Sequence, residues 1–196
     1  MSNLELRIEA LEKQLMQLSS DLEDLRGTLL LVGDIQRYSR LRDLLTAGDL
    51  DAADVETADL MADGLVDRHG DVTPEALERC PAAMLQIIDG LWRTASQGRL
   101  GFVVQQQLYR SLGGSRESLI SQDLALFGHF CQTVGWPTRG GMGLLLPDDL
   151  RVPVSSALDA DGLPPQGHLP LRCWENNYGL KAANLLMARL IEVFGA

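Results

Sequence analysis

The chain has 196 residues, a formal net charge of −10 and a sequence pI near 4.7. This charge excludes a general nucleic-acid-binding protein, because an acidic surface repels the phosphate backbone. No apolar run approaches the ~20 residues that a membrane-spanning helix needs. The three cysteines, Cys80, Cys131 and Cys173, show no paired spacing, which is typical of reduced thiols in a cytoplasmic protein.

The N-terminal residues 1–32 are predicted to form a coiled-coil oligomerisation helix. Apolar residues recur at alternating spacings of four and three, with heptad position d held by Leu4, Leu11, Leu18 and Leu25, and position a by Ile8, Leu15, Leu22 and Leu29. The flanking contacts of a parallel pair join Arg7 to Glu12 and Asp21 to Arg26. Both contacts are attractive, which favours a parallel, in-register assembly. Self-association through residues 4–29 is therefore expected, with a dimer favoured over a trimer. The alternative is an amphipathic helix that folds back onto its own domain.

The remaining residues, 33–196, are predicted to form one all-α domain, a compact bundle of short helices. Helices are expected at about 35–47, from Asp49 to Leu65, at 74–79, from Pro81 through Trp92, and at 102–112, 117–134 and 180–194. Two of these starts carry capping signals, Asp49 and Thr73-Pro74. A long loop over residues 137–170 holds six of the eight prolines and shows no helical period.

No residue constellation indicates an enzyme. His129 and Cys131 have no third metal ligand at recognisable spacing. The acidic run from Asp49 to Asp59 misses the register of a calcium loop. His168 lies among loop residues without a nucleophile motif nearby, and we expect it to hold the loop by hydrogen bonding.

A helix–helix corner is the most informative pattern in the chain. In IIDGLWRTASQGRLGFVVQ, residues 87–105, Asp89 and Trp92 precede a break, and Gly101-Phe102 opens a second helix. Glycine beside a large aromatic residue predicts a close backbone approach. This run resembles the "IDxLW…S-x-G-x-FGFSVQ" pattern of the GUN4 family. Three further segments resemble that family in the same order, namely Asp54-x-Glu56-Thr57, Phe127 to Trp136, and Gln166 to Pro170.

The resemblance implies a protein that binds protoporphyrin IX or Mg-protoporphyrin IX, without a covalently bound cofactor. It also implies a non-catalytic regulator that stimulates magnesium chelatase, through that enzyme's large porphyrin-binding subunit, in chlorophyll synthesis. The implied location is a bacterial cytoplasm, at the periphery of photosynthetic membranes. In the family the long loop arches over a concave groove that holds the porphyrin.

Carried onto this sequence, the resemblance implies ligand-binding residues on two walls and at a charged rim. One wall comprises Leu65, Val72 and Leu77, the other Leu145, Leu146 and Leu169, and the rim for the propionates comprises Arg139, Arg151 and Arg172. A flat macrocycle on aliphatic side chains with its carboxylates beside cations is physically sound. The alternative is that these leucines anchor the loop and the arginines form a solvated rim.

Two departures from the family pattern keep a second function open. Gln106 and Gln107 follow Gln105 where the family usually has basic residues, and no aromatic residue lies between Trp136 and Trp174. Both changes weaken a porphyrin site by removing charge and aromatic area. The second hypothesis is therefore a helical protein-interaction scaffold whose tetrapyrrole site is vestigial or altered, for example toward a bilin.

Overall fold

A computed structural model describes residues 14–18, 33, 36–65, 72–137, 157–158, 162–174 and 178–195. The chain divides into two compact units, Met1–Ser39 and Arg40–Ala196. In the first unit, residues 14–18 and 36–39 are helical, as the heptad pattern predicts for the former. The pairing of residues 4–29 and the domain boundary after residue 32 stay predictions.

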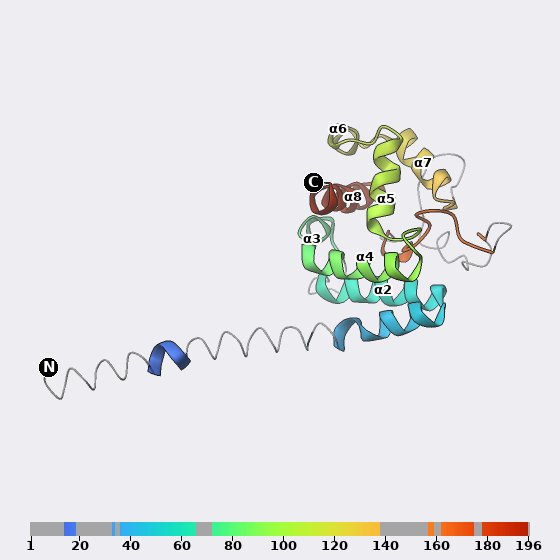
Figure 1. The fold of residues 1–196 in the computed structure, drawn as a ribbon. Coiled ribbons are helices and arrows are strands. Elements are labelled where there is room, and N and C mark those ends of the chain that lie inside the picture. Colours follow the sequence, from blue (N-terminus) through green and yellow to red (C-terminus); the bar gives the residue numbers. More distant parts are fainter. Residues whose placement is uncertain are drawn as a thin grey trace, which may run out of the picture. The chain divides into compact units, whose positions relative to one another are not determined.

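The second unit, Arg40–Ala196, is the helical domain, and its described residues form no strand. The fold class predicted from the sequence is confirmed. Its elements are helical residues 40–47, α2 (Leu50–Leu65), α3 (Pro74–Glu78), α4 (Ala82–Ala95), α5 (Phe102–Ser111), α6 (Arg116–Ile120), α7 (Leu124–Thr133), the 3₁₀ turn η2 (Arg172–Trp174) and α8 (Leu180–Phe194). Figure 1 shows α2 alongside α4, with α5 leaving the end of α4 and α8 viewed end-on beside α5.

Local capping signals decide where several of these helices begin. The Asp49 carboxylate accepts a hydrogen bond from the Ala52 N–H at 3.1 Å, and Thr73 Oγ1 accepts one from the Ala76 N–H at 3.2 Å. Each bond satisfies a donor that the first helical turn leaves without a partner. Gly48 adopts φ +76°, a conformation that glycine tolerates well, and so ends the preceding helix.

The helix predicted over 117–134 is in fact two helices, α6 and α7. Ser121 and Gln122 form a turn in which Gln122 has φ +52°, and Asp123 then caps α7 by accepting from the Leu126 N–H at 3.0 Å. The apolar pattern continues across this break, but the turn and the aspartate cap after it end the first helix. The last helix, by contrast, has the predicted bounds.

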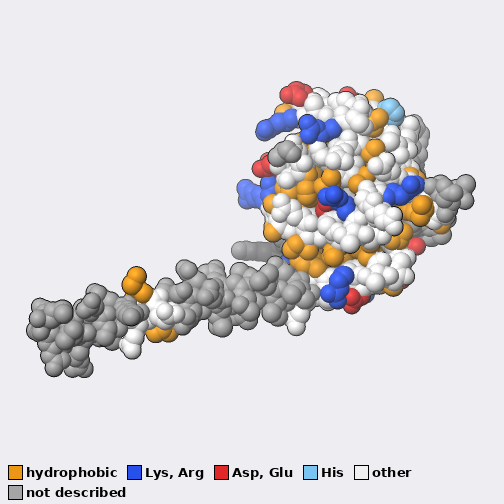
Figure 2. All heavy atoms as spheres, viewed as in Figure 1, with side chains coloured by type: hydrophobic (Ala, Val, Ile, Leu, Met, Phe, Trp, Pro, Cys, Tyr) orange, Lys and Arg blue, Asp and Glu red, His pale blue; other side chains and the backbone are white. Residues whose placement is uncertain are grey.

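Helix α8 and an aromatic cluster form the core. Helix α8 contacts α3, α4, α5 and α6, and it buries residues including Ala182, Leu186 and Leu190. The ring of Phe130 lies edge-on to Trp136 at a centroid distance of 5.3 Å, and Trp136 lies 5.4 Å from Trp174. On the face shown in Figure 2, hydrophobic side chains of this unit lie in bands between charged ones.

Candidate functional site

The chain returns to the helices through residues 162–174, called here the return segment, and α2 holds one end of it. The Asp54 carboxylate accepts hydrogen bonds from the backbone N–H groups of Leu171, at 2.7 Å, and Arg172, at 3.1 Å. Burial raises the Asp54 pKa from 3.8 to about 6, although these two N–H groups favour the charged form. A buried carboxylate on α2 therefore sets the position of Arg172.

The predicted corner between α4 and α5 is confirmed as a close backbone approach. Asp89 Oδ1 accepts from the Val103 N–H at 2.9 Å and so caps α5 from the neighbouring helix. Gly101 has φ +120°, and a Cβ there would lie 2.7 Å from the same oxygen. Burial raises the Asp89 pKa, and the N–H groups at the start of α5 oppose that rise. Glycine is needed here because the cap occupies the space of a side chain.

Trp92 and Thr57 join α4 to α2. The indole Nε1–H of Trp92 donates to Thr57 Oγ1 at 2.9 Å, and the Thr57 hydroxyl donates to the Ala53 carbonyl at 2.8 Å. Both side chains are fully buried, so the bond satisfies an indole donor that would otherwise be costly. Also on α2, the Glu56 carboxylate forms an ion pair with Arg40, with Oε2 and Nε 3.1 Å apart.

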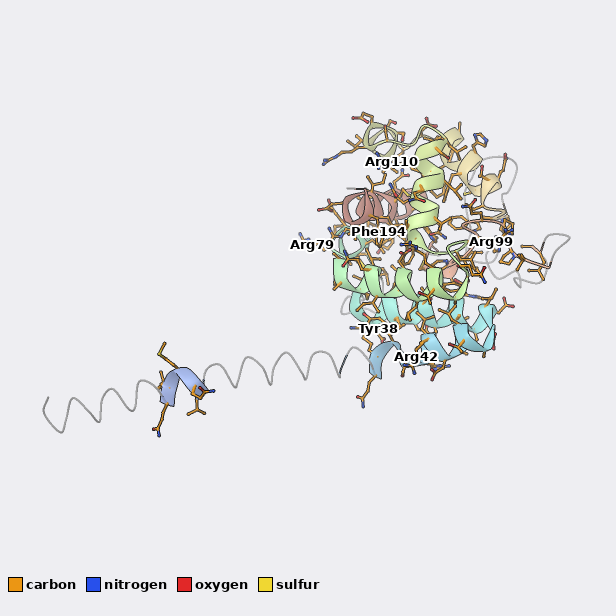
Figure 3. All side chains as sticks on the ribbon, in the orientation of Figure 1. Tyr38, Arg42, Arg79, Arg99, Arg110 and Phe194 are labelled. Carbon is orange, nitrogen blue, oxygen red and sulfur yellow. The ribbon has the colours of Figure 1, made fainter. Side chains whose placement is uncertain are left out.

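The corner also holds the other end of the return segment. Gln105 Nε2 donates to the carbonyls of Gly167, at 3.0 Å, and Pro170, at 2.8 Å, while the Gly167 N–H donates to Arg99 O at 3.0 Å. The Arg99 Nε–H in turn donates to Pro164 O at 2.8 Å; Figure 3 shows this side chain near the end of α4.

His168 fixes the loop by hydrogen bonding, as the sequence predicts. Its Nδ1 lies 2.8 Å from Val134 O, and its carbonyl accepts from Trp136 Nε1 at 2.7 Å. Burial lowers the His168 pKa, so the ring is neutral at pH 7. Hydrogen bonds therefore join the segments that carry the four sequence patterns, namely the corner, α2, α7 with the residues after it, and the return segment, into one framework.

A cavity of about 310 Å³ lies against this framework; we call it the α2 groove. Its lining residues are Val55, Ala58, Asp59, Met61, Ala62, Leu65, Val72, Leu77, Arg172 and Cys173. The lining comes from one face of α2, from α3 and the residues before it, and from η2. The volume is at the lower end of the range for small-molecule pockets. The described residues thus supply an apolar wall with one arginine.

Four of the residues named from the sequence meet in this groove: Leu65, Val72, Leu77 and Arg172. Leu169 is fully buried and is not among the lining residues, so its packing anchors the return segment instead. The remaining positions, Arg139, Leu145, Leu146 and Arg151, lie outside the described residues. Whether any of these residues binds a ligand stays a prediction.

Of the α2 face of the groove, sequence reasoning identified only Leu65. Val55, Ala58, Asp59 and Ala62 recur at the spacing of one helix face, which continues to Leu65. This helical spacing in the sequence could have indicated which face of α2 lines the groove. Cys173 was expected only as a reduced thiol. Burial raises its pKa well above the ordinary value, and burial also raises the pKa values of Cys80 and Cys131.

Two further kinds of feature are absent from the described part of the chain. It contains no group of three or more His, Cys, Asp or Glu side chains placed to hold a metal ion. None of its helices combines the length and the apolar character that crossing a bilayer requires.

One family model matches most of the chain, and two solved structures share its fold. The model of the family described as GUN4-like matches residues 33–186. The ligand-free structure of Arabidopsis thaliana GUN4 is similar at a TM-score of 0.57 and 24% identity, covering 82% of this chain and 95% of that one. The structure of GUN4 from Chlamydomonas reinhardtii is similar at 0.52 and 20% identity, covering 80% and 89%. These two likenesses show the fold.

A curated relative is similar in sequence over a shorter stretch. It is an uncharacterized protein, ycf53, of Pyropia yezoensis, 34% identical over 95 residues, or 48% of this chain. That stretch covers 32% of the relative, so the chain spans about a third of the relative's length.

Proposed function

The chain belongs to the GUN4-like family, a family of regulatory porphyrin-binding proteins, and we propose that it binds protoporphyrin IX and its magnesium complex in the α2 groove. The observation that carries this proposal is the composition of the groove wall. Met61, Leu65 and Leu77 offer aliphatic surface to a flat macrocycle, and Arg172 supplies a cation for a propionate.

Arg172 suits this role because its backbone is fixed by a hydrogen bond, whereas its guanidinium group is only weakly paired. Its N–H is bound to Asp54, which fixes the residue, whereas its Nε lies 3.9 Å from the Asp54 carboxylate, at the outer limit of an ion pair. The guanidinium carries five donors in a planar fork. It therefore keeps donors for a propionate. We propose that Arg139 and Arg151 bind the remaining propionate charge of the porphyrin. Leu145 and Leu146 would form the opposite wall of its binding site.

The further step of the proposal is that the protein acts on magnesium chelatase without catalysing a reaction itself. It would present the porphyrin to the chelatase's large porphyrin-binding subunit and raise the rate of magnesium insertion. The proposed place of action is the cytoplasm, beside photosynthetic membranes. Membership of the GUN4-like family supports this regulatory step. The α2 groove is the proposed site at which the porphyrin would be held.

The binding test is a tryptophan-quenching titration with deuteroporphyrin IX and its magnesium complex, comparing two matched variants. Ala62→Phe fills the groove from α2, and Ala52→Phe adds the same ring to the same helix at a half-buried position outside the groove. Binding in the low-micromolar range is expected for the wild type. Ala62→Phe should weaken it at least about tenfold, or 1.4 kcal/mol, while Ala52→Phe leaves it unchanged. Equal affinities in all three proteins would rule out the α2 groove.

The regulatory step has its own test, the rate of magnesium insertion by purified chelatase with and without this protein. Stimulation by the wild type and by Ala52→Phe, but not by Ala62→Phe, is the expected result. If the protein binds porphyrin but does not stimulate the chelatase, the proposed activation of that enzyme is refuted and only a role as porphyrin carrier remains.

We also propose self-association through residues 4–29, on which the alternative scaffold function depends. Leu15 and Leu18, at heptad positions a and d, are 73% and 63% exposed in the single chain. Large exposed leucines at these positions are what a coiled coil covers. Light scattering should report a dimer that Leu15→Glu dissociates and that Met16→Glu, at position b, leaves intact. A monomeric wild type would remove this proposal without affecting the groove.

A further inference from the structure

A second concave surface lies between α3, α6 and α8, on different residues from the α2 groove. Its cavity measures about 300 Å³ and is lined by Glu78, Arg116, Leu119, Ile120, Gln122, Lys181, Asn184, Leu185 and Ala188. We call it the α6–α8 pocket. Helix α3 separates the two cavities, because Leu77 lines the first and Glu78 the second.

The pocket contains a buried amide that lacks a hydrogen-bond partner. Asn184 is 5% exposed, and its Nδ2 bonds to no described residue. A buried amide group without a partner destabilises the fold, because its lost hydrogen bonds to water are not replaced. The unpartnered atom is the amide nitrogen, so the group is a hydrogen-bond donor for an acceptor in the pocket. An unsatisfied polar group of this kind fits a ligand that completes its hydrogen bonds.

The α6 side of the pocket is anchored by hydrogen bonds and carries two apolar side chains, Leu119 and Ile120. Ser115 and Ser118 form a capping box at the start of α6, and Ser118 Oγ lies 2.9 Å from Tyr109 Oη on α5. This arrangement presents Leu119, which is buried, beside Ile120, which is 74% exposed. An exposed isoleucine at the rim of a cavity offers apolar surface to a bound aliphatic group.

The pocket lining includes two cations that can bind a carboxylate, although Glu78 lies in the same lining and Glu75 lies beside Lys181. Arg116 and Lys181 bring two positive charges and Glu78 one negative charge, on a chain whose net charge is −10. Within the described residues no salt bridge joins Arg116 to an acid. Lys181 lies 3.6 Å from Glu75, and both side chains are more than half exposed, so this pair is weak and can exchange. Figure 2 shows Lys or Arg side chains beside the position of α6 in Figure 1.

We propose that the α6–α8 pocket binds the C-terminal residue of a partner protein when that residue is aliphatic. One such residue supplies an aliphatic side chain for Leu119 and Ile120, a carboxylate for Arg116 and Lys181, and a peptide group for Asn184. Capture of a terminal carboxylate is a recurring mode of peptide recognition. The cavity volume of about 300 Å³ is enough for a short terminal segment. This proposal does not depend on porphyrin binding.

The test uses the full chain and a fluorescein-labelled peptide, Gly-Ser-Gly-Ser-Gly-Leu, in an anisotropy titration. The peptide with a free carboxylate is expected to bind with a Kd of about 1 mM or below. The same peptide with an amidated C-terminus should bind at least about fivefold more weakly, because the charge-assisted bonds are lost. N-acetyl-leucine should compete, but with lower affinity than the peptide.

Two matched variants separate recognition from folding. Asn184→Leu removes the orphaned amide and is expected to fold at least as stably as the wild type, while peptide binding falls at least about fivefold. Gln106→Leu removes another buried amide whose Nε2 has no partner among the described residues, but which lines neither cavity; binding should not change. Arg116→Gln, at an exposed position, serves as a second pocket variant that leaves the core intact.

Three results would overturn the proposal. The first is the absence of any rise in anisotropy up to about 1 mM protein, where a Kd of about 1 mM would give half-maximal binding. The second is equal binding of the free and amidated peptides, or equal binding by Asn184→Leu and the wild type. The third is tighter binding of N-acetyl-leucine than of the peptide, which would assign the pocket to a small metabolite.

Discussion

Gly101→Ala tests whether the corner between α4 and α5 depends on close approach of the backbone. The residue has φ +120° and ψ 168°, a region that only glycine adopts readily, so the backbone strain costs about 1–3 kcal/mol. The new Cβ would lie 2.7 Å from Asp89 Oδ1 and 3.2 Å from Arg93 Cγ. If Asp89 moves away, α5 loses its cap at a cost of about 1 kcal/mol. The expected loss of unfolding free energy is therefore about 2–4 kcal/mol.

Urea denaturation followed by circular dichroism measures this loss, and a second glycine in α4 provides the control. Gly90 is exposed in the middle of the helix, and a Cβ added there would meet nothing within 4 Å, so Gly90→Ala should stabilise the protein by about 0.5–1 kcal/mol. The same substitution thus has opposite signs at two positions eleven residues apart.

A double-mutant cycle separates the steric clash from the backbone strain. In an Asp89→Ala background the clash disappears, so Gly101→Ala should cost about 1 kcal/mol less than it does in the wild type. If Gly101→Ala lowers the unfolding free energy of the otherwise wild-type protein by less than about 1 kcal/mol, the inference of backbone strain at this position is refuted. An identical cost in both backgrounds would show that Asp89 does not occupy the space in question.

Further predictions concern the buried polar groups of the framework. For Asp54→Asn, the native pKa of about 6 lies above the unfolded value of 3.8, so the stability that the carboxyl group contributes is present below pH 4 and lost as the pH rises through 6. The substituted asparagine cannot ionise and keeps an oxygen for Leu171 and Arg172. In urea titrations the variant should therefore gain about 2–2.5 kcal/mol relative to the wild type between pH 4 and 7. A difference that stays constant with pH would contradict the raised pKa. Thr57→Val leaves the buried Trp92 indole N–H without its partner and should cost about 1–3 kcal/mol, whereas Thr46→Val, at an exposed position, should cost under about 0.5 kcal/mol. His168→Phe removes the bond to Val134 and should raise amide hydrogen exchange in the return segment; unchanged exchange there would show that the ring does not hold it.

Much of the helical domain was predictable because its signals are local. Asp49 and Thr73 cap helices that their own side chains start, and the glycine at 101 marks a corner whose partners lie within fifteen residues. Hydrogen bonds across three or four residues, and the period of a helix, can be recognised in a short stretch of sequence. The break between α6 and α7 was missed because the apolar period continues across it, while the turn residues that cause it are few.

The candidate site was only partly predictable, because contacts between distant segments decide it. Leu65, Val72 and Leu77 were placed in one wall by resemblance, and they do line one groove. Leu169 could not be separated from them by its residue type, yet it is fully buried in the framework instead.

The sequence by itself determined the helical class, most helix ends and the corner with its glycine, because capping, helical period and backbone conformation act over a few residues. Only the tertiary structure decided that Asp54 binds a backbone 117 residues away, which sets Arg172 at the edge of the groove. It alone revealed the unpartnered amide of Asn184. Burial and hydrogen-bond satisfaction depend on which segments meet in space, and an isolated residue type carries no record of its neighbours.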